Sequence, residues 1–220
     1  MNDGPRGRPL PVLPGAPHLG FRCNGCGDCC RAVRVALTHH DLERLATGLA
    51  RPAPRFVEWL APDDVDMTDE PGSFVELREG RRLMVLLQDE GACHLLDDGQ
   101  RCTAYAHRPL DCRLYPLDLS RDDAGDVVSV SRLDPNGCGD EAGPSADVGE
   151  LAALDARRWR ELAEYQARVA RWNRIAAHRR RFGRAPGDAA EFLAFIARPS
   201  PSHSDERCSG AATVPASREI

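Results

Sequence analysis

Four cysteines lie within eight residues near the start of the chain, in the run Cys23-Asn-Gly-Cys26-Gly-Asp-Cys29-Cys30. Cysteines this close in sequence cannot pair as disulfides without strain. Thiolates at this spacing can instead wrap one loop around a metal, and the intervening glycines permit the positive backbone φ that an inward-turning loop needs. The run therefore predicts a metal-binding loop.

Four further cysteines follow at longer intervals, namely Cys93, Cys102, Cys112 and Cys138. Each lies beside turn residues or charges rather than inside an apolar run, which favours ligation over packing as a small hydrophobic residue. Zinc and iron–sulfur clusters both accept four thiolates, and C-x2-C-x2-C is also a bacterial ferredoxin spacing. Eight thiolates suffice for two four-cysteine centres, or for one centre with four other thiols, and the sequence leaves both open.

The adjacent pair Cys29 and Cys30 raises a separate question. Because neighbouring side chains are expected to diverge, we expect the two thiols either to serve two centres or to include one that does not bind the metal. A disulfide framework and a dithiol redox pair such as Cys23 and Cys26 remain alternatives. The ninth cysteine, Cys208, lies in a Ser/Pro-rich tail and is expected to stand outside the site.

Other side chains near the cysteines are secondary candidates. His94 and His107 are possible substitute ligands, although the cysteines already suffice in number. Arginines close to the cysteines can offset the negative charge of a thiolate-bound metal: Arg22, Arg31, Arg101, Arg108 and Arg113. The chain has no lysine, which excludes a Schiff-base lysine, and it has no glycine-rich nucleotide loop after a strand, no HExxH and no GxSxG, so no catalytic residue is predicted.

Size and charge bound the remaining possibilities. The 220 residues suit one domain with appended segments, and the net charge of −5 gives no reason to expect nucleic acid as a partner. The absence of a run of about 18 apolar residues predicts no membrane span. Residues 1–20 lack an apolar signal region, so we expect a cytoplasmic protein. In that reducing compartment, clustered cysteines bind metal more often than they form disulfides.

Hydrophobic periodicity predicts four helices. One covers Asp41–Leu49 with Thr38 as its cap and an acidic residue three positions later, and a short one covers Phe56–Leu60. A long amphipathic helix covers Val148–Phe182, and a further short helix covers Asp188–Ala197. The apolar positions of the long helix are Leu151, Leu154, Leu162, Tyr165, Val169, Trp172 and Ile175.

Alternating apolar residues predict strands at Phe74–Leu77, Leu83–Leu87 and Val127–Leu133, the first two joined by a hairpin turn. The expected fold is therefore α+β: a small, irregular, cysteine-rich, metal-held domain with a short antiparallel sheet and a long C-terminal helix. The expected organisation is a flexible arm (1–20), a cysteine-cluster domain (21–140), a helical segment packing on it (148–198) and a disordered tail (199–220).

The two cysteine groups together carry a family resemblance. CNGCGDCC, followed by CHLLDDGQRCTAYAHRPLDCRLYPL, resembles the YkgJ-type CxxCxxCC cysteine-cluster family of zinc- or iron-chelating domains, over roughly residues 21–140. The resemblance implies metal binding by Cys23, Cys26, Cys29 and Cys30, with Cys93, Cys102, Cys112 and Cys138 at the matching downstream positions. The family is similar to the cysteine-rich part of flagellin lysine methylases, which look like iron–sulfur proteins, so the resemblance favours an iron–sulfur cluster, such as 4Fe-4S, over zinc. His94 stands where the family pattern has proline, which points to a local role.

Three functions follow as hypotheses. The first is a metal-binding protein whose cluster or ion serves structure, redox chemistry or metal handling. The second is an enzyme of methyltransferase-like or radical type, in which the cluster is one component. The third is a zinc-stapled interaction module that docks through the 148–182 helix. In each, we expect metal binding to be coupled to folding, because the ligands span more than half of the chain.

Overall fold

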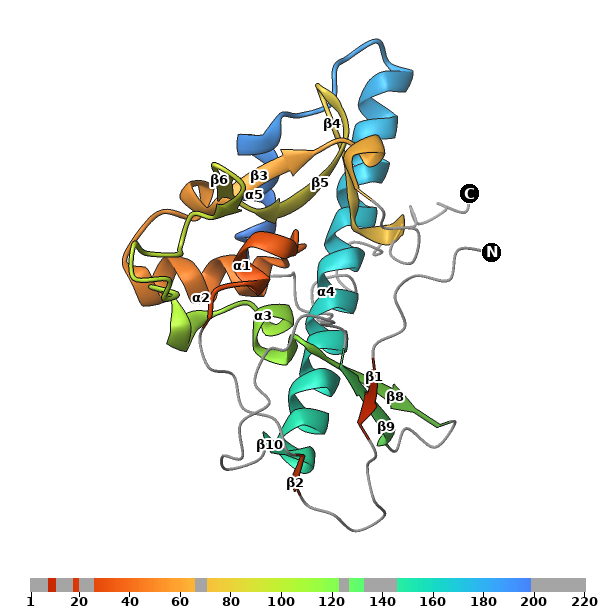
Figure 1. Ribbon diagram of the computed structural model, residues 1–220. Helices are drawn as coiled ribbons and strands as arrows, with labels where there is room; N and C mark the ends of the chain where they lie inside the picture. The colour runs from red at the N-terminus through yellow and green to blue at the C-terminus, as the bar shows by residue number, and fades with distance from the viewer. Residues whose placement is uncertain are drawn as a thin grey trace, which may run out of the picture.

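The computed structural model describes residues 8–10, 18–19, 26–65, 71–122, 127–132 and 146–198. The fold is α+β, as predicted: small antiparallel sheets and short helices are arranged along one long helix, α4 (Val148–Arg181) (Figure 1). Among the described residues, no helix is both long and apolar enough to cross a membrane.

Helix α4 follows its predicted bounds to within one residue. Asp147 caps its first turn by accepting a hydrogen bond from Glu150 N at 2.9 Å, and Gly183, with a φ of +69°, follows its end. The buried stripe differs from the prediction at both ends: Leu151 and Leu154 are only half-buried, and Ile175 is 38% exposed while Ala176 is buried. The stripe thus keeps the spacing of three and four residues that one helix face requires.

A three-stranded antiparallel sheet lies against one end of α4 in the order β3 (Val57–Leu60), β5 (Gly80–Leu86), β4 (Phe74–Leu77). The two strands predicted as a hairpin are β4 and β5 and are confirmed. Side chains of α4 bind the edge strand directly, since Trp172 Nε1 donates to the carbonyl of Glu76 at 2.9 Å and Asn173 Oδ1 accepts from the backbone N–H of the same residue at 2.8 Å.

The short helix predicted for Phe56–Leu60 is wrong. A 3-10 turn ends at Phe56, and the next four residues form β3, which pairs with β5 so that Trp59 faces Met84 across the ladder. Short apolar runs are ambiguous between helix and strand. Here the free edge of β5 satisfies the backbone hydrogen bonds of Val57–Leu60, and β-branched and aromatic side chains suit a strand.

Three further sheets complete the fold: β1 (Arg8–Leu10), β9 (Val127–Arg132) and β8 (Leu117–Arg121) in that order, β10 (Ala146–Asp147) with β2 (His18–Leu19), and β6 (Gln88–Asp89) with β7 (Ala92–Cys93). Strand β9 confirms the third predicted strand. Two short strands thus lie within the predicted N-terminal arm. The predicted disordered tail, 199–220, lies outside the described residues.

Helix α2 (His39–Leu49) begins with the predicted capping box. Thr38 Oγ1 accepts from Asp41 N at 3.2 Å, and Asp41 Oδ2 accepts from Thr38 N at 2.8 Å. The buried Asp41 carboxylate also accepts from Arg44 and from Leu110 N. Arg44 in turn donates to both carboxylate oxygens of Glu161 on α4, at 2.9 and 2.7 Å. One arginine therefore links the start of α2 to the middle of α4.

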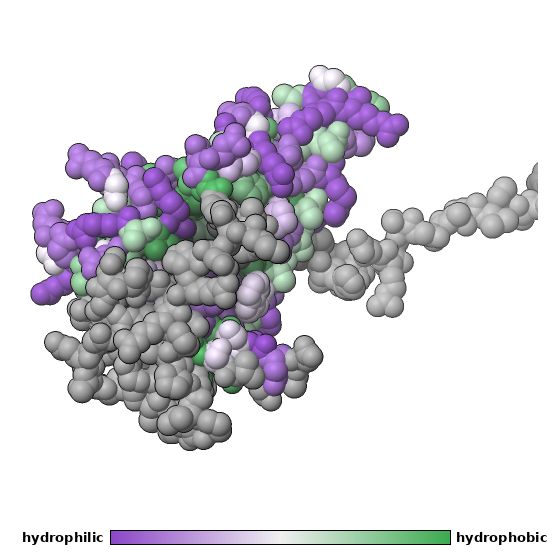
Figure 2. Space-filling model, turned by 45° about the vertical axis from the view of Figure 1, so that its right-hand side comes forward, coloured by the Kyte–Doolittle hydropathy of each residue, from purple (hydrophilic) through white to green (hydrophobic). Residues whose placement is uncertain are grey.

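The main hydrophobic core lies between α2, the β3–β5–β4 sheet, α4 and α5 (Ala189–Ile196). Leu45, Phe56, Met84, Trp172 and Phe192 are among its buried members. On the face shown in Figure 2, hydrophilic residues (purple) form most of the described outer surface, and apolar residues (green) occupy smaller areas between them. Cys93 is itself a member of this core, and the partly buried Cys30 and Cys102 pack against it.

The Arg44–Glu161 pair gives a test of how α2 is attached to α4. Glu161→Gln should lower the free energy of unfolding by roughly 2–3 kcal/mol, because a half-buried guanidinium loses its charged bidentate partner. Urea unfolding measures this. Glu43→Gln makes the same charge change at an exposed position of α2 and should shift stability by less than about 0.5 kcal/mol. Equal changes in the free energy of unfolding for the two substitutions would contradict the stabilising role of the Arg44–Glu161 ion pair.

The same pair predicts an acid dependence. Burial by itself raises the pKa of Glu161, but hydrogen bonds from Arg44 and Arg157 outweigh it, so this pKa lies below its ordinary value of 4.5. The stabilisation is therefore present above about pH 4.5 and is lost as the pH falls through the lower, folded-state pKa. The stability difference between the native protein and Glu161→Gln should shrink in that acid range, and a constant difference would argue against the carboxylate's role.

Candidate metal centre

Thiols from both cysteine groups line one cavity of about 840 Å³. The described cysteines on its wall are Cys26, Cys29, Cys30, Cys93, Cys102 and Cys112. The other two predicted ligands, Cys23 and Cys138, lie outside the described residues. The fold thus brings cysteines from the first loop and from the later segment 93–112 to the wall of the same cavity.

The first cysteine loop approaches the second at Gly27. This glycine is buried with a φ of +78°, and a Cβ built on it would stand 3.2 Å from the carbonyl oxygen of Gln100 and 3.2 Å from a methyl of Leu96. Arg31 closes the contact, because its guanidinium donates to Gly27 O at 3.3 Å and to the side-chain oxygen of Gln100. Only glycine combines this backbone angle with so close an approach, as the spacing of the loop predicts.

Cys29 and Cys30 begin the short helix α1 (Cys29–Ala32), and their side chains do not diverge as expected. Their sulfur atoms lie 4.0 Å apart, and both face the same cavity. Both thiols are therefore placed to reach one centre, while the expectation that they serve separate centres or separate roles stays a prediction. Successive residues of a helix differ by about 100° in direction, so both thiols can reach one cavity when it lies over the helix's first turn.

The described cysteines of the second group come from β7, the loop after it and α3 (Leu110–Leu114). Cys93 is buried in β7, and the following loop is closed by hydrogen bonds from Asp97 N to Arg101 O at 2.9 Å and from Arg101 N to Asp97 Oδ1 at 2.8 Å. This turn places Cys102 beside Cys93 on the cavity wall. Cys112 comes from α3, which packs against α4.

Burial and mutual proximity shift the thiol pKa values. Hydrogen bonding with Cys30, aided by Arg108, lowers the pKa of Cys29 to about 6, and the same contact, together with burial, raises the pKa of Cys30. Burial raises the pKa of Cys93, Cys102 and, most strongly, Cys112. Each of these thiols also lies within electrostatic range of others in the group. The charge on any one of these five thiols therefore affects the pKa of others among them.

The described sulfurs surround the cavity instead of meeting at a point. No three described thiol sulfurs all lie within 4.8 Å of one another. Four thiolates on one Zn²⁺, at about 2.3 Å each, stand about 3.8 Å apart by tetrahedral geometry. The sulfur atoms of Cys29 and Cys30, 4.0 Å apart, lie close to that spacing.

The two histidines considered as substitute ligands make other contacts. His94 Nδ1 donates to the carbonyl of Leu87 at 3.1 Å, and its ring lies 5.8 Å from the ring of Phe56. The ring of His107 packs directly on Gly48 of α2, where a Cβ would overlap it. Neither histidine is among the residues that line the cavity.

Two charged residues of α4 that the sequence analysis did not single out also line the cavity, Asp155 and Arg158. Arg158 donates to Asp111 of α3 at 3.2 Å, and the buried Asp155 accepts from Arg121 at 3.0 Å. Charged residues on a long helix resemble an ordinary solvated face. Only their contacts with α3 and β8, elements distant in sequence, distinguish them from such a face.

A cavity lined by thiols from several short elements has the donor groups that a metal-chelating site requires. The family model CxxCxxCC, described as "Putative zinc- or iron-chelating domain", matches residues 22–131, half of the chain, and the protein belongs to this family, as its motifs predict. Neither a curated protein nor a solved structure matches the chain. All six thiols on the cavity wall lie within the matched residues.

The raised thiol pKa values predict how metal binding depends on pH. Cysteines bind metals as thiolates, and burial raises the pKa of Cys93, Cys102 and Cys112, so binding of a metal by these thiols would release protons. Affinity should therefore rise by at least about tenfold per pH unit between pH 6 and 8. Competition titrations of Zn²⁺ against a chelator at several pH values measure this, and an affinity independent of pH would contradict it.

Proposed function

We propose that this protein holds an iron–sulfur cluster in the thiol-lined cavity and uses it for structure and redox chemistry. The observation that carries the proposal is the convergence of thiols from four separate segments on one cavity. The proposed ligand set, from which the cluster's corners are drawn, is Cys23, Cys26, Cys29, Cys30, Cys93, Cys102, Cys112 and Cys138.

The spread of the sulfurs supports a cluster over a single zinc ion. A mononuclear zinc site draws its ligands to within about 3.8 Å of one another and leaves no internal space. An iron–sulfur cluster is larger, because sulfide bridges separate its irons and each cysteine binds its own corner. The described thiols are distributed around a cavity, and no three of their sulfur atoms lie within 4.8 Å of one another. This arrangement suits an iron–sulfur cluster better than a single zinc ion.

The charges around the cavity also suit a group with several thiolates. Arg108 lies within electrostatic range of Cys29 and Cys102. Its guanidinium lies 3.7 Å from the centre of the Tyr105 ring, and its Nε donates to Tyr105 O at 3.0 Å, which fixes its direction. Arginines on the wall offset the negative charge of the thiolates and tune the cluster's electronic properties.

A second candidate, an enzyme in which the cluster is one component, is favoured by the shape of the cavity. Its wall extends from the thiols to Asp155 and Arg158 on α4. The volume of about 840 Å³ lies within the range of about 300–1,000 Å³ usual for small-molecule sites. A molecule that bound against these charges would lie beside the cluster.

Metal analysis after anaerobic purification tests the proposal. The protein should contain iron and acid-labile sulfide, with little zinc. Cys29→Ser and Cys93→Ser remove one thiol from each cysteine group and should each lower the iron content by more than half. Cys208→Ser is the matched control, because this cysteine lies outside the family match, and it should leave the iron content unchanged. Colourless protein with stoichiometric zinc and no sulfide would overturn the cluster.

Removing the metal should loosen the cysteine domain more than the long helix. The elements that carry the thiols are short, with four residues in α1, two in β7 and five in α3. Because such short elements are weakly stable by themselves, bonds to the metal should contribute much of their stability. Hydrogen exchange with and without a chelator should show the largest loss of protection around these elements and the smallest within Tyr165–Ala176 of α4. Equal protection in the two states would contradict the coupling of metal to folding.

A further inference from the structure

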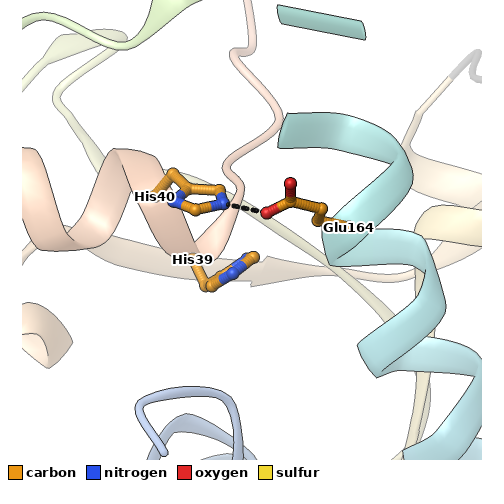
Figure 3. A group of neighbouring side chains, drawn as sticks. All are labelled: His39, His40 and Glu164. Carbon is orange, nitrogen blue, oxygen red and sulfur yellow. Dashed lines mark hydrogen bonds and ion pairs between the residues drawn. The ribbon is translucent and has the colours of Figure 1, made fainter. Parts of the chain in front are cut away.

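A second group of potential ligands lies outside the thiol cavity. His39 and His40, at the start of α2, face Glu164 on α4 (Figure 3). One ligand atom from each of the three residues lies within 4.8 Å of the other two, and no other such group exists among the described residues. None of the three residues lines the thiol cavity.

The three side chains already contact one another. His40 Nε2 lies 2.7 Å from Glu164 Oε2, and the rings of His39 and His40 have their centres 4.0 Å apart. His39 Nδ1 is buried and has no hydrogen-bond partner in the described part of the chain. Buried polar atoms are nearly always paired, so an unpaired ring nitrogen beside a carboxylate and a second imidazole needs an explanation.

The scaffold holds these residues in place. His40 and Arg44 are four residues apart on α2, and Glu161 and Glu164 are three apart on α4, so each pair shares a helix face. The Arg44–Glu161 ion pair, with contacts of 2.9 and 2.7 Å, therefore fixes the separation of the helices one turn away from the group. The capping box at Thr38 fixes the first turn of α2, which carries both histidines.

We propose that His39, His40 and Glu164 form a second metal site, which binds a divalent transition metal of the Zn²⁺ type. Two imidazoles and one carboxylate are the donor set of mononuclear zinc sites in which three protein ligands leave the fourth position to water or an external ligand. The side chain of Glu164 is 62% exposed, so this fourth position opens to solvent. The donors differ in kind from the thiolates of the cysteine centre.

Neighbouring charges shift the pKa of His39 in both directions: His40 and Arg168 lower it, and Glu161 and Glu164 raise it. Burial, followed by the neighbouring His40, lowers the pKa of His39 to about 4, which keeps its ring in the neutral form that binds metals. Arg168 also lies within electrostatic range, but its guanidinium donates to the carbonyls of Ile196 and Arg198 at 2.9 and 2.6 Å. The carboxylates of Glu161 and Glu164 oppose its charge.

Zinc stoichiometry tests the site in the intact protein with its cysteine centre already filled. After equilibrium dialysis against Zn²⁺ alone, the native protein should hold one more equivalent than Glu164→Gln or the double variant His39→Gln/His40→Gln. Glu43→Gln, at an exposed position of α2, is the matched control and should keep the extra equivalent. Because the comparison is between variants that share the cysteine centre, it holds whichever metal that centre contains.

Cobalt distinguishes the two kinds of donor. Co²⁺ added in place of Zn²⁺ should give, for the extra equivalent, ligand-field absorption without the thiolate-to-metal charge transfer that cysteine ligands produce. Unchanged unfolding temperatures would show that the variants are folded. Equal zinc uptake by the native protein and both variants, or charge transfer accompanying the extra cobalt, would overturn the second site.

Discussion

The meeting of thiols from distant parts of the chain at one cavity is the constraint on which the rest of the structure depends. Cys26, Cys29 and Cys30 come from a loop and one turn of helix, while Cys93 and Cys112 come from a two-residue strand and a short helix. Elements this short have little stability of their own. Their positions must be set from outside, by contacts between the two cysteine groups and by the helix behind them.

Helix α4 supplies much of that external support. It binds the edge of the β3–β5–β4 sheet through Trp172 and Asn173, α2 through Glu161, and α3 through Arg158 (Figure 1). The last two contacts are ion pairs that lie near the two candidate metal sites. One rigid element thereby sets the separation of parts that carry ligands, and Gly27 lets the two cysteine loops close on each other. In the function proposed above, metal bonds would complete a scaffold that is already assembled on one side.

The sequence predicted the parts of this structure that depend on local pattern. The capping box at Thr38, the hairpin of β4 and β5, and the bounds of α4 follow from spacing alone, and the cysteine motifs identified the family. The segment Val57–Leu60 was misread because the partner strand that decides its state is distant in sequence. Asp155 and Glu164 were missed for the same reason, since a carboxylate on a helix acquires its role only from what packs against it.

X-ray absorption at the iron and zinc edges of the anaerobically purified protein would distinguish an iron–sulfur cluster from a zinc ion in the cavity, because it reports the element, its ligands and any second metal nearby. A cluster in the thiol-lined cavity should give an iron edge with sulfur neighbours and a clear iron–iron scattering contribution. A zinc edge with four sulfur neighbours, and no iron–iron contribution, would contradict it.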